Sequence, residues 1–356
     1  MIDYCTFIDI KKSDFDVTYK NRLMFIGSCF ADNIGGKMSE YKFNVDVNPF
    51  GVLYNPLSVA SACMRMLKPD LFVESDLFSY NGMYHSFMHH GKFSDVSADN
   101  CLTEINKSLK SAAENFRDIS FLAITFGTAY VYHLKEQCTT HNAQRTMGTV
   151  IPSEEKICPD MYDGPVVANC HKLPAALFER ELLTVVKIVD VWSALLEEVW
   201  SVNPSLKVIF TVSPIRHFKD GAHFNQISKA TLLLAQQQLV DKYTGRISYF
   251  PAYELMMDEL RDYRFYADDM LHPSKIAVDY IHERFCDTYM CPETKATMKE
   301  VGEICRALSH IPLNPSSDAY KQFLMQTLLK IKRLQEKFPY LCLSEEEKEI
   351  EGKLQN

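Results

Sequence analysis

The sequence lacks several features that would place the chain in a special class. No run approaches the roughly 18 apolar residues of a membrane-spanning helix, so no membrane partner is expected. A basic excess is also missing: the net charge is −8 and the pI is about 5.8, so nucleic acid is not an expected partner. No internal repeat or low-complexity tract occurs. The 356 residues, 47% hydrophobic and 24% charged, therefore have the composition of a globular protein with a full core.

A secretion signal is not found before the first apolar run. That run, Leu23 to Ile26, is shorter than the roughly 7–15 residues of a signal core, and aspartates precede it where a signal would be basic. The "IGSC" at 26–29 is therefore not expected to mark a lipidated cysteine, and we expect a cytoplasmic protein. The eleven cysteines are scattered and contain no C-x-x-C pair, which favours free buried thiols over a disulfide framework.

Five short apolar runs alternate with helical patterns along the first 290 residues. The runs are "RLMFIG", "FNVDV", "ISFLAITFG", "LKVIFTVSP" and "RISYFP". Helices are expected over 30–41, 57–67, 103–116, 178–202, 226–243 and 274–289, with Ile105, Leu109, Ala112 and Phe116 on one face of the third. This alternation predicts an α/β fold, a parallel sheet covered by helices on both faces, with strand order 2-1-3-4-5.

Two segments are expected to lie outside this sheet domain of residues 1–291. Residues 134–168 have little periodicity and several Gly and Pro breakers, which predicts an inserted loop. Residues 292–356 have helical patterns throughout and predict a helical C-terminal extension. Its apolar face (Tyr320, Phe323, Leu324, Leu328, Ile331 and Leu334) would pack on the sheet domain or form a homodimer.

Ser28 follows the first strand and directly precedes a helix. In the predicted strand order, the ligand crevice lies at the carboxyl ends of strands one and three, which places Ser28 and Gly127-Thr128 there. A serine at a helix N-terminus has backbone N–H groups and a favourable dipole beside it, as a nucleophile would need. An ordinary N-cap serine has the same position, so this alternative stays open.

A second motif, Asp269-x-x-His272, lies after strand five and before the last helix of the domain. A histidine can accept the serine proton, and a nearby carboxylate can orient the imidazole. Small and polar residues also stand at other strand ends, among them Gly51 and Thr128. Such residues let the backbone approach a substrate or donate to an oxyanion.

Together these blocks resemble the SGNH/GDSL hydrolase superfamily, and "GSCFA" at 27–31 resembles the name-giving motif of its GSCFA family. The resemblance also covers "FNVDVNPFGVLYNP", "ITFGTAYVY", "NCHKLP", "FTVSPIRHFKDGAH", "YADDMLHPS" and the helical tail. It implies a three-layer α/β/α sandwich. It also implies Ser28 as nucleophile, His272 as general base and Asp269 as its orienting partner.

One departure from the superfamily pattern concerns the oxyanion. The superfamily uses an asparagine after strand three as a donor, whereas this chain has Gly127-Thr128-Ala129 there. We expect backbone N–H groups of Ser28 and Gly51 as two donors. Asn169 or His171 is expected as the third, with Thr128 as the less favoured choice. His85, His171, Arg216 and His217 are expected near the substrate.

Two rival chemistries remain. Cys29 would be a nucleophile at the same helix N-terminus, although a buried structural thiol is the favoured interpretation. Histidines and cysteines also gather in "HSFMHH" (His85, His89, His90), in Cys138-x-x-His141 and in Cys170-His171. No H-E-x-x-H pattern completes a zinc site, so no metal and no other cofactor is expected; a cluster of loop histidines is the alternative interpretation.

The sequence thus predicts a serine hydrolase that cleaves a carboxylic ester of a small molecule or carbohydrate through Ser28, His272 and Asp269. Transfer of the acyl group to another alcohol is an alternative, because both outcomes share one acyl-enzyme. A weakly active binding protein on a hydrolase fold is the other alternative, supported by the missing asparagine.

Overall fold

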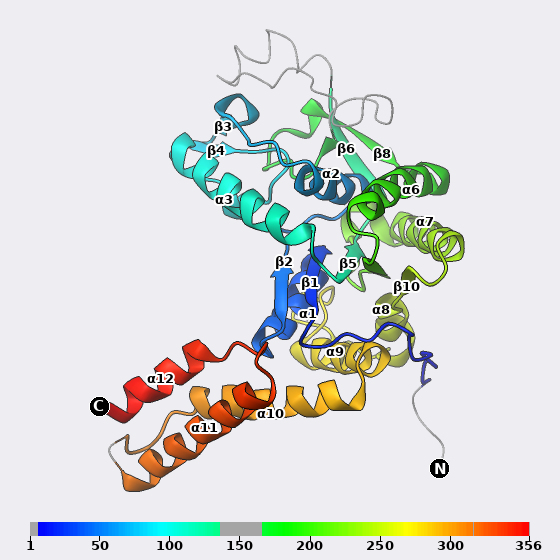
Figure 1. Cartoon of the computed structure of the whole chain (residues 1–356). Coiled ribbons are helices and arrows are strands. Elements are labelled where there is room, and N and C mark those ends of the chain that lie inside the picture. Colours follow the sequence, from blue (N-terminus) through cyan, green and yellow to red (C-terminus); the bar gives the residue numbers. More distant parts are fainter. Residues whose placement is uncertain (1–5, 136–165, 316, 356) are drawn as a thin grey trace.

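The computed structural model describes residues 6–135, 166–315 and 317–355, and its centre is a five-stranded parallel sheet (Figure 1). The strands are β1 (Arg22–Gly27), β2 (Asn44–Val47), β5 (Phe121–Phe126), β9 (Lys207–Val212) and β10 (Ile247–Tyr249). Their order is β2-β1-β5-β9-β10, and every pair is parallel. This confirms the predicted parallel sheet and its order 2-1-3-4-5.

Helices pack on both faces of the sheet because alternate side chains of each strand are buried on opposite sides. Met24 and Ile26 of β1 join one core with α2 (Pro56–Leu67), α3 (Ala98–Phe116), α6 (Val185–Val202) and α7 (Gly221–Lys242). Leu23 and Phe25 join a second core with α1 (Cys29–Glu40) and α9 (Lys275–Tyr289). In Figure 1, α2, α3 and α6 lie above the sheet and α9 lies below it. The predicted apolar face of α3 is buried as expected.

The segment 178–202 differs from the prediction of one long helix. Residues Phe178–Leu182 form the strand β8, and α6 begins only after Thr184, whose side chain caps it. Strand β8 pairs with β6 (Tyr130–Leu134), which also pairs with β7 (Val166–Val167), and this antiparallel sheet is separate from the central one. The reason is local: Glu179 and Arg180 are exposed, and the apolar residues of this stretch stand only at its ends.

A hairpin also stands where the sequence indicated only loops. Strands β3 (Phe78–Tyr80) and β4 (Met83–His85) pair antiparallel across Asn81-Gly82, and both turn residues have positive φ. Asn-Gly is the pair that such a two-residue turn favours. Most of the predicted inserted loop, residues 136–165, lies outside the described residues; its flanks belong to β6 and β7.

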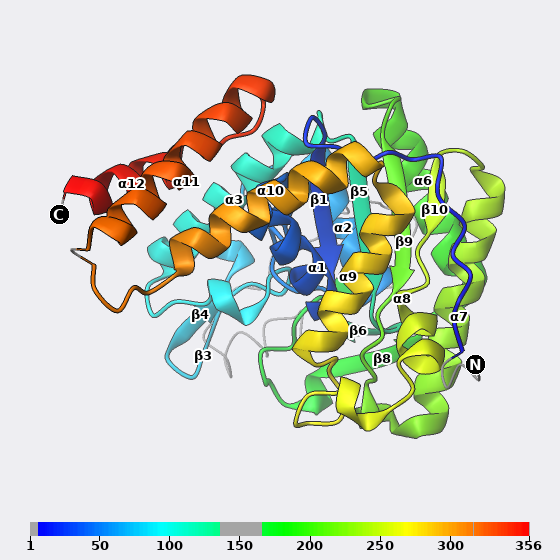
Figure 2. The ribbon, with the colours of Figure 1, turned by 90° about the horizontal axis from the view of Figure 1, so that it is seen from below.

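The C-terminal extension is helical in its described residues, as predicted. It contains α10 (Pro292–Ser309), α11 (Asp318–Lys337) and α12 (Ser344–Gln355). Leu324, Ile331 and Leu334 are buried in the same core as Phe25, so the extension packs on the sheet domain below α1 and α9. Figure 2 shows α10 running past α9 toward the outlying α11 and α12. A homodimer through these helices stays a prediction.

Two further predictions concern membrane-spanning helices and the state of the cysteine side chains. Within the described ranges, no helix has the length and apolar character needed to cross a membrane. The cysteines of these ranges are free thiols, and Cys63, Cys101 and Cys286 are buried.

Candidate functional site

Ser28 stands at a tight corner between β1 and α1. Gly27 has φ +140°, and a Cβ there would lie 2.1 Å from the carbonyl oxygen of Thr125 on β5, so a side chain is excluded. Ser28 donates its own N–H to the same oxygen at 3.2 Å, and its Oγ accepts the Phe30 N–H at 3.3 Å. The serine therefore caps α1. Its side chain is 1% exposed.

Asn48 fixes this corner and is a residue that the sequence analysis missed. It follows β2 with φ +44° and is 1% exposed. Its Oδ1 accepts the Gly27 N–H at 2.8 Å, and its Nδ2 donates to Asp32 Oδ1 at 2.5 Å. One amide thus joins the end of β1 to the first turn of α1. An asparagine directly before a proline at a strand end was the available sequence signal.

Asp269 and His272 are in contact. Asp269 Oδ2 lies 2.5 Å from His272 Nδ1, while its Oδ1 accepts the N–H groups of Leu271 and His272 at 2.9 Å each. These backbone hydrogen bonds, followed by the imidazole, lower the pKa of Asp269 to about 2. Both side chains are about half-exposed. The carboxylate therefore holds the ring in one orientation and leaves Nε2 free of it.

Among the described residues, Ser28 Oγ accepts a hydrogen bond from the Phe30 N–H and makes none with His272. Such bonds are often loose without a substrate and tighten in the complex. The topology nonetheless brings their elements together. Ser28 opens α1, His272 immediately precedes α9, and α1 packs against α9 on one face of the sheet.

His217 lies in the segment after β9, and its ring reaches Gly127 at the end of β5, the strand next to β1. A Cβ on Gly127 would stand 3.2 Å from His217 Nε2, and the His217 ring meets the Tyr54 ring edge-on at 5.5 Å. Nε2 is buried and has no hydrogen-bond partner among the described residues. Burial first, then the Lys229 charge, lowers the pKa of His217 to about 4. The imidazole is therefore neutral at pH 7.

Lys229 is a second residue that the sequence analysis missed. Its side chain is fully buried, and Nζ donates to the carbonyl oxygens of Gly127 and Ser213 at 2.7 Å each. Burial, and then Arg216, lowers the pKa of Lys229 to about 7. The lysine thus joins the end of β5 to the segment that carries His217. It lies on α7 within "QISKATLLL", where nothing local distinguishes it from a solvent-facing lysine.

Two of the donors proposed for the oxyanion are engaged elsewhere in this structure. The Gly51 N–H donates to Asn48 O at 2.7 Å. Thr128 Oγ1 contacts Ser228 Oγ and accepts the Tyr130 N–H, both at 3.1 Å. Asn169 accepts the His171 N–H at 2.9 Å through its Oδ1, not through the Nδ2 that would donate to an oxyanion. The oxyanion role of these groups stays a prediction, and Gly51 and Thr128 would need a rearrangement to perform it.

The histidines of "HSFMHH" are mostly interior rather than in a surface cluster. His89 is 1% exposed because its ring stacks on Phe50 and meets the edges of two other phenylalanines. Both ring nitrogens of His85 have protein partners, Ser94 Oγ and Tyr80 O, and His171 Nε2 contacts Ser86 O at 2.8 Å. A substrate role for His85 and His171 stays a prediction.

The remaining candidates are possible metal ligands, Arg216 and Cys29. The described ranges hold no group of three or more His, Cys, Asp or Glu side chains arranged for a metal ion, and Cys138 and His141 lie outside those ranges. Arg216 donates to Gln226 Oε1 at 3.4 Å, and its buried Nε has no hydrogen-bond partner in the part of the chain that the structure describes. Cys29 is half-buried, and its Sγ lies 3.7 Å from the Tyr54 hydroxyl.

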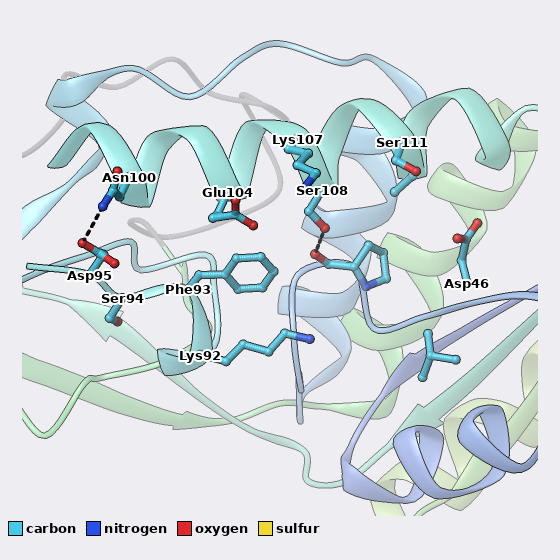
Figure 3. Close-up of a pocket in the computed structure, with 13 residues that line it drawn as sticks. Asp46, Lys92, Phe93, Ser94, Asp95, Asn100, Glu104, Lys107, Ser108 and Ser111 are labelled. Carbon is cyan, nitrogen blue, oxygen red and sulfur yellow. Dashed lines mark hydrogen bonds between the residues drawn. The ribbon is translucent and has the colours of Figure 1, made fainter. Parts of the chain in front are cut away.

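A cavity of about 500 Å³ lies between α3 and the loops after β2 and before α3. Figure 3 shows the Phe93 ring in it between Glu104 of α3 and Lys92, with Ser108 donating to Pro49 O. None of the predicted site residues lines it. Its lining includes Pro49, the chain neighbour of Asn48, which contacts Gly27 at the corner.

Comparisons with known proteins give a family. A model of the GSCFA family matches residues 22–151 and 157–285, and a model described as "GSCFA domain protein, C-terminal domain" matches residues 301–356. Searches of the curated proteins and of the solved structures find no match.

Proposed function

The chain belongs to the GSCFA family, and from this premise we propose that it is a serine hydrolase of the SGNH type, with that superfamily's three-layer α/β/α architecture, acting on a carboxylic ester. Ser28 Oγ attacks the ester carbonyl, and His272 Nε2 takes the hydroxyl proton and returns it to the leaving alcohol. Asp269 holds the imidazole and stabilises its charged form. Water then hydrolyses the acyl-enzyme with the same histidine as base.

The contact between Asp269 and His272 is the observation that carries this proposal. A carboxylate at 2.5 Å from Nδ1 selects the tautomer that leaves Nε2 as the proton acceptor. Further support comes from the position of Ser28 at the N-terminus of α1, where the helix dipole favours a developing anion. The strand order also matches the arrangement in which ligands bind at the carboxyl ends of the central strands.

We propose that the alcohol part of the ester is polar and rich in hydroxyl groups, as it is in a carbohydrate ester. Its support is the cavity that shares the loop after β2 with the Ser28 corner. The walls carry charged and amide side chains, among them Glu104, Lys107 and Asn100, around the Phe93 ring. Such a lining offers hydrogen bonds to hydroxyl groups and one apolar surface, whereas a fatty alcohol would need apolar walls.

The burial of Ser28 favours acyl transfer as a second candidate function. With a side chain 1% exposed, its acyl-enzyme would be shielded from bulk water, and an alcohol held in the site would compete well with water. Adding glycerol or glucose to an ester assay distinguishes the two outcomes, because a transferase forms the new ester in place of the free acid.

The proposed function can be tested by covalent labelling of the nucleophile. A fluorophosphonate probe should modify Ser28 in the full chain, and peptide mass mapping should find no adduct on Cys29. Ser28→Ala should abolish both labelling and hydrolysis of p-nitrophenyl acetate, while Cys29→Ala, the neighbouring control, should retain them. Labelling of Cys29 instead would make the cysteine the nucleophile. The absence of both labelling and hydrolysis in the parent would reject the hydrolase and favour a binding protein.

A further inference from the structure

The tetrahedral intermediate of ester cleavage carries an oxyanion that needs donors, and this requirement rests on the proposed function. The superfamily's asparagine after strand three is absent, since Gly127-Thr128 stands there. Thr128 Oγ1 and His171 Nε2, which the sequence suggested as substitutes, contact other protein groups, and Asn169 is held through its oxygen. A donor that is already in place and has no partner would need no rearrangement.

His217 provides such a group. Its Nε2 is buried without a partner among the described residues, and it stands 3.2 Å from where a Gly127 side chain would begin. Gly127 is the residue after β5, and Thr125 of that strand accepts the Ser28 N–H. Because Gly127 has no side chain, the His217 ring and Tyr54 approach the end of β5 closely, and Nε2 of His217 faces this strand end, one strand away from the serine.

We infer that His217 donates a hydrogen bond from Nε2 to the oxyanion, in the role that the superfamily gives to its asparagine. In a neutral imidazole with its proton on Nε2, this nitrogen donates one hydrogen bond, as an amide N–H does, while Nδ1 is the acceptor. The Tyr54 ring packs edge-on against the imidazole at 5.5 Å and limits its rotation. Lys229 ties Gly127 to Ser213, four residues before His217, and so fixes the donor relative to the strand end.

The electrostatic surroundings separate this role from that of a general base. Burial, Lys229, His272 and Arg180 all disfavour the protonated ring, and only Asp220 favours it. An imidazole that resists protonation is a poor base at pH 7 but keeps its single N–H. His272, with its carboxylate partner, is the better base.

The experiment compares His217→Ala, His217→Gln and the control His223→Ala in the full chain. His223 is exposed on α7 and contacts only Phe224 in the described structure. With p-nitrophenyl acetate, His217→Ala should lower kcat about 100-fold with little change in KM, because an oxyanion exists only in the transition state. His217→Gln, which returns an N–H donor, should recover at least tenfold of that loss, and His223→Ala should match the parent.

Two results would overturn the inference while leaving the proposed function intact. One is a loss below tenfold in His217→Ala, measured on a parent whose Ser28 is labelled by the fluorophosphonate. The other is a glutamine variant no faster than the alanine variant at an unchanged melting temperature. A parent that neither hydrolyses the ester nor reacts with the probe would remove the proposed function and this inference together.

Discussion

At the scale of single residues, Lys229 combines complete burial with two carbonyl acceptors. As a neutral amine it has two N–H bonds, which matches the two described acceptors, Gly127 O and Ser213 O. Burial lowers its pKa from 10.5 to about 7, so the unfolded chain binds a proton that the folded chain releases between these values. The contribution of Lys229 to the free energy of unfolding therefore rises as pH increases from 7 toward 10.5.

We predict that Lys229→Met lowers the free energy of unfolding by about 1–3 kcal/mol, because two buried carbonyl groups lose their donor. The difference between parent and variant should widen as pH rises from 7 to 10. Urea unfolding at several pH values measures it, and Lys110→Met on the exposed side of α3 is the matched control. A difference that stays constant over this range would show that Lys229 titrates near its ordinary pKa.

The sequence predicted single residues well only where their partners are close along the chain. Asp269 and His272 are three residues apart, so their contact could be foreseen. Asn48, Lys229 and the position of His217 depend on partners 16 to 102 residues away or on neighbouring strand ends. A sequence pattern without pairing information contains no signal for such contacts, which explains why the first two were missed.

At the scale of elements, the corner from β1 to α1 depends on the absence of a side chain at Gly27. We predict that Gly27→Ala lowers the free energy of unfolding by more than about 3 kcal/mol or prevents folding. The Cβ would overlap Thr125 O at 2.1 Å, and φ +140° is strained for alanine. Thermal unfolding followed by circular dichroism measures the effect.

Gly36 provides the matched control within α1. A Cβ there meets nothing within 4 Å. Gly36→Ala should therefore raise the free energy of unfolding by about 0.5–1 kcal/mol, since alanine is the better helix former. Equal effects of the two substitutions would mean that the corner is not as tight as described.

The prediction of helices and strands succeeded where the period of the hydrophobic residues and the capping residues indicated the same element. The alternation of buried strands with long amphipathic helices gave the order of the central sheet, because parallel neighbours need crossover helices. It failed at β8, whose five residues precede a long helix without a Gly or Pro between them. It also failed at β3 and β4, where each strand has only three residues and so shows too little period.

At the scale of the whole molecule, four histidines with a lowered pKa make stability sensitive to acid. Burial lowers the pKa of His89 to about 3, and those of His171, His217 and His282 to about 4. The unfolded chain takes up these protons near pH 6.5, whereas the folded chain resists them. Their contribution to the free energy of unfolding is present above pH 6.5 and is lost as pH falls toward 4.

We predict that the free energy of unfolding falls between pH 6.5 and 4, with up to about 1.4 kcal/mol per pH unit from each imidazole. His282→Leu should make this fall shallower, since it removes one of the four rings. His223→Ala, at an exposed ring, should leave the slope unchanged. Urea unfolding at pH 7 and pH 5 provides the comparison, and identical slopes for parent and His282→Leu would contradict the explanation.

The burial of Phe25 has a consequence for how the chain is made. The Phe25 ring of β1 packs against the ring of Phe285 on α9, 260 residues later in the sequence, with a centroid distance of 6.1 Å. At about 5–20 residues per second, a ribosome needs roughly 10 to 50 seconds to add the residues between them. One face of β1 is therefore exposed through most of synthesis. The nascent chain has to avoid aggregation for that time, and folding of this core is completed only when translation is nearly over.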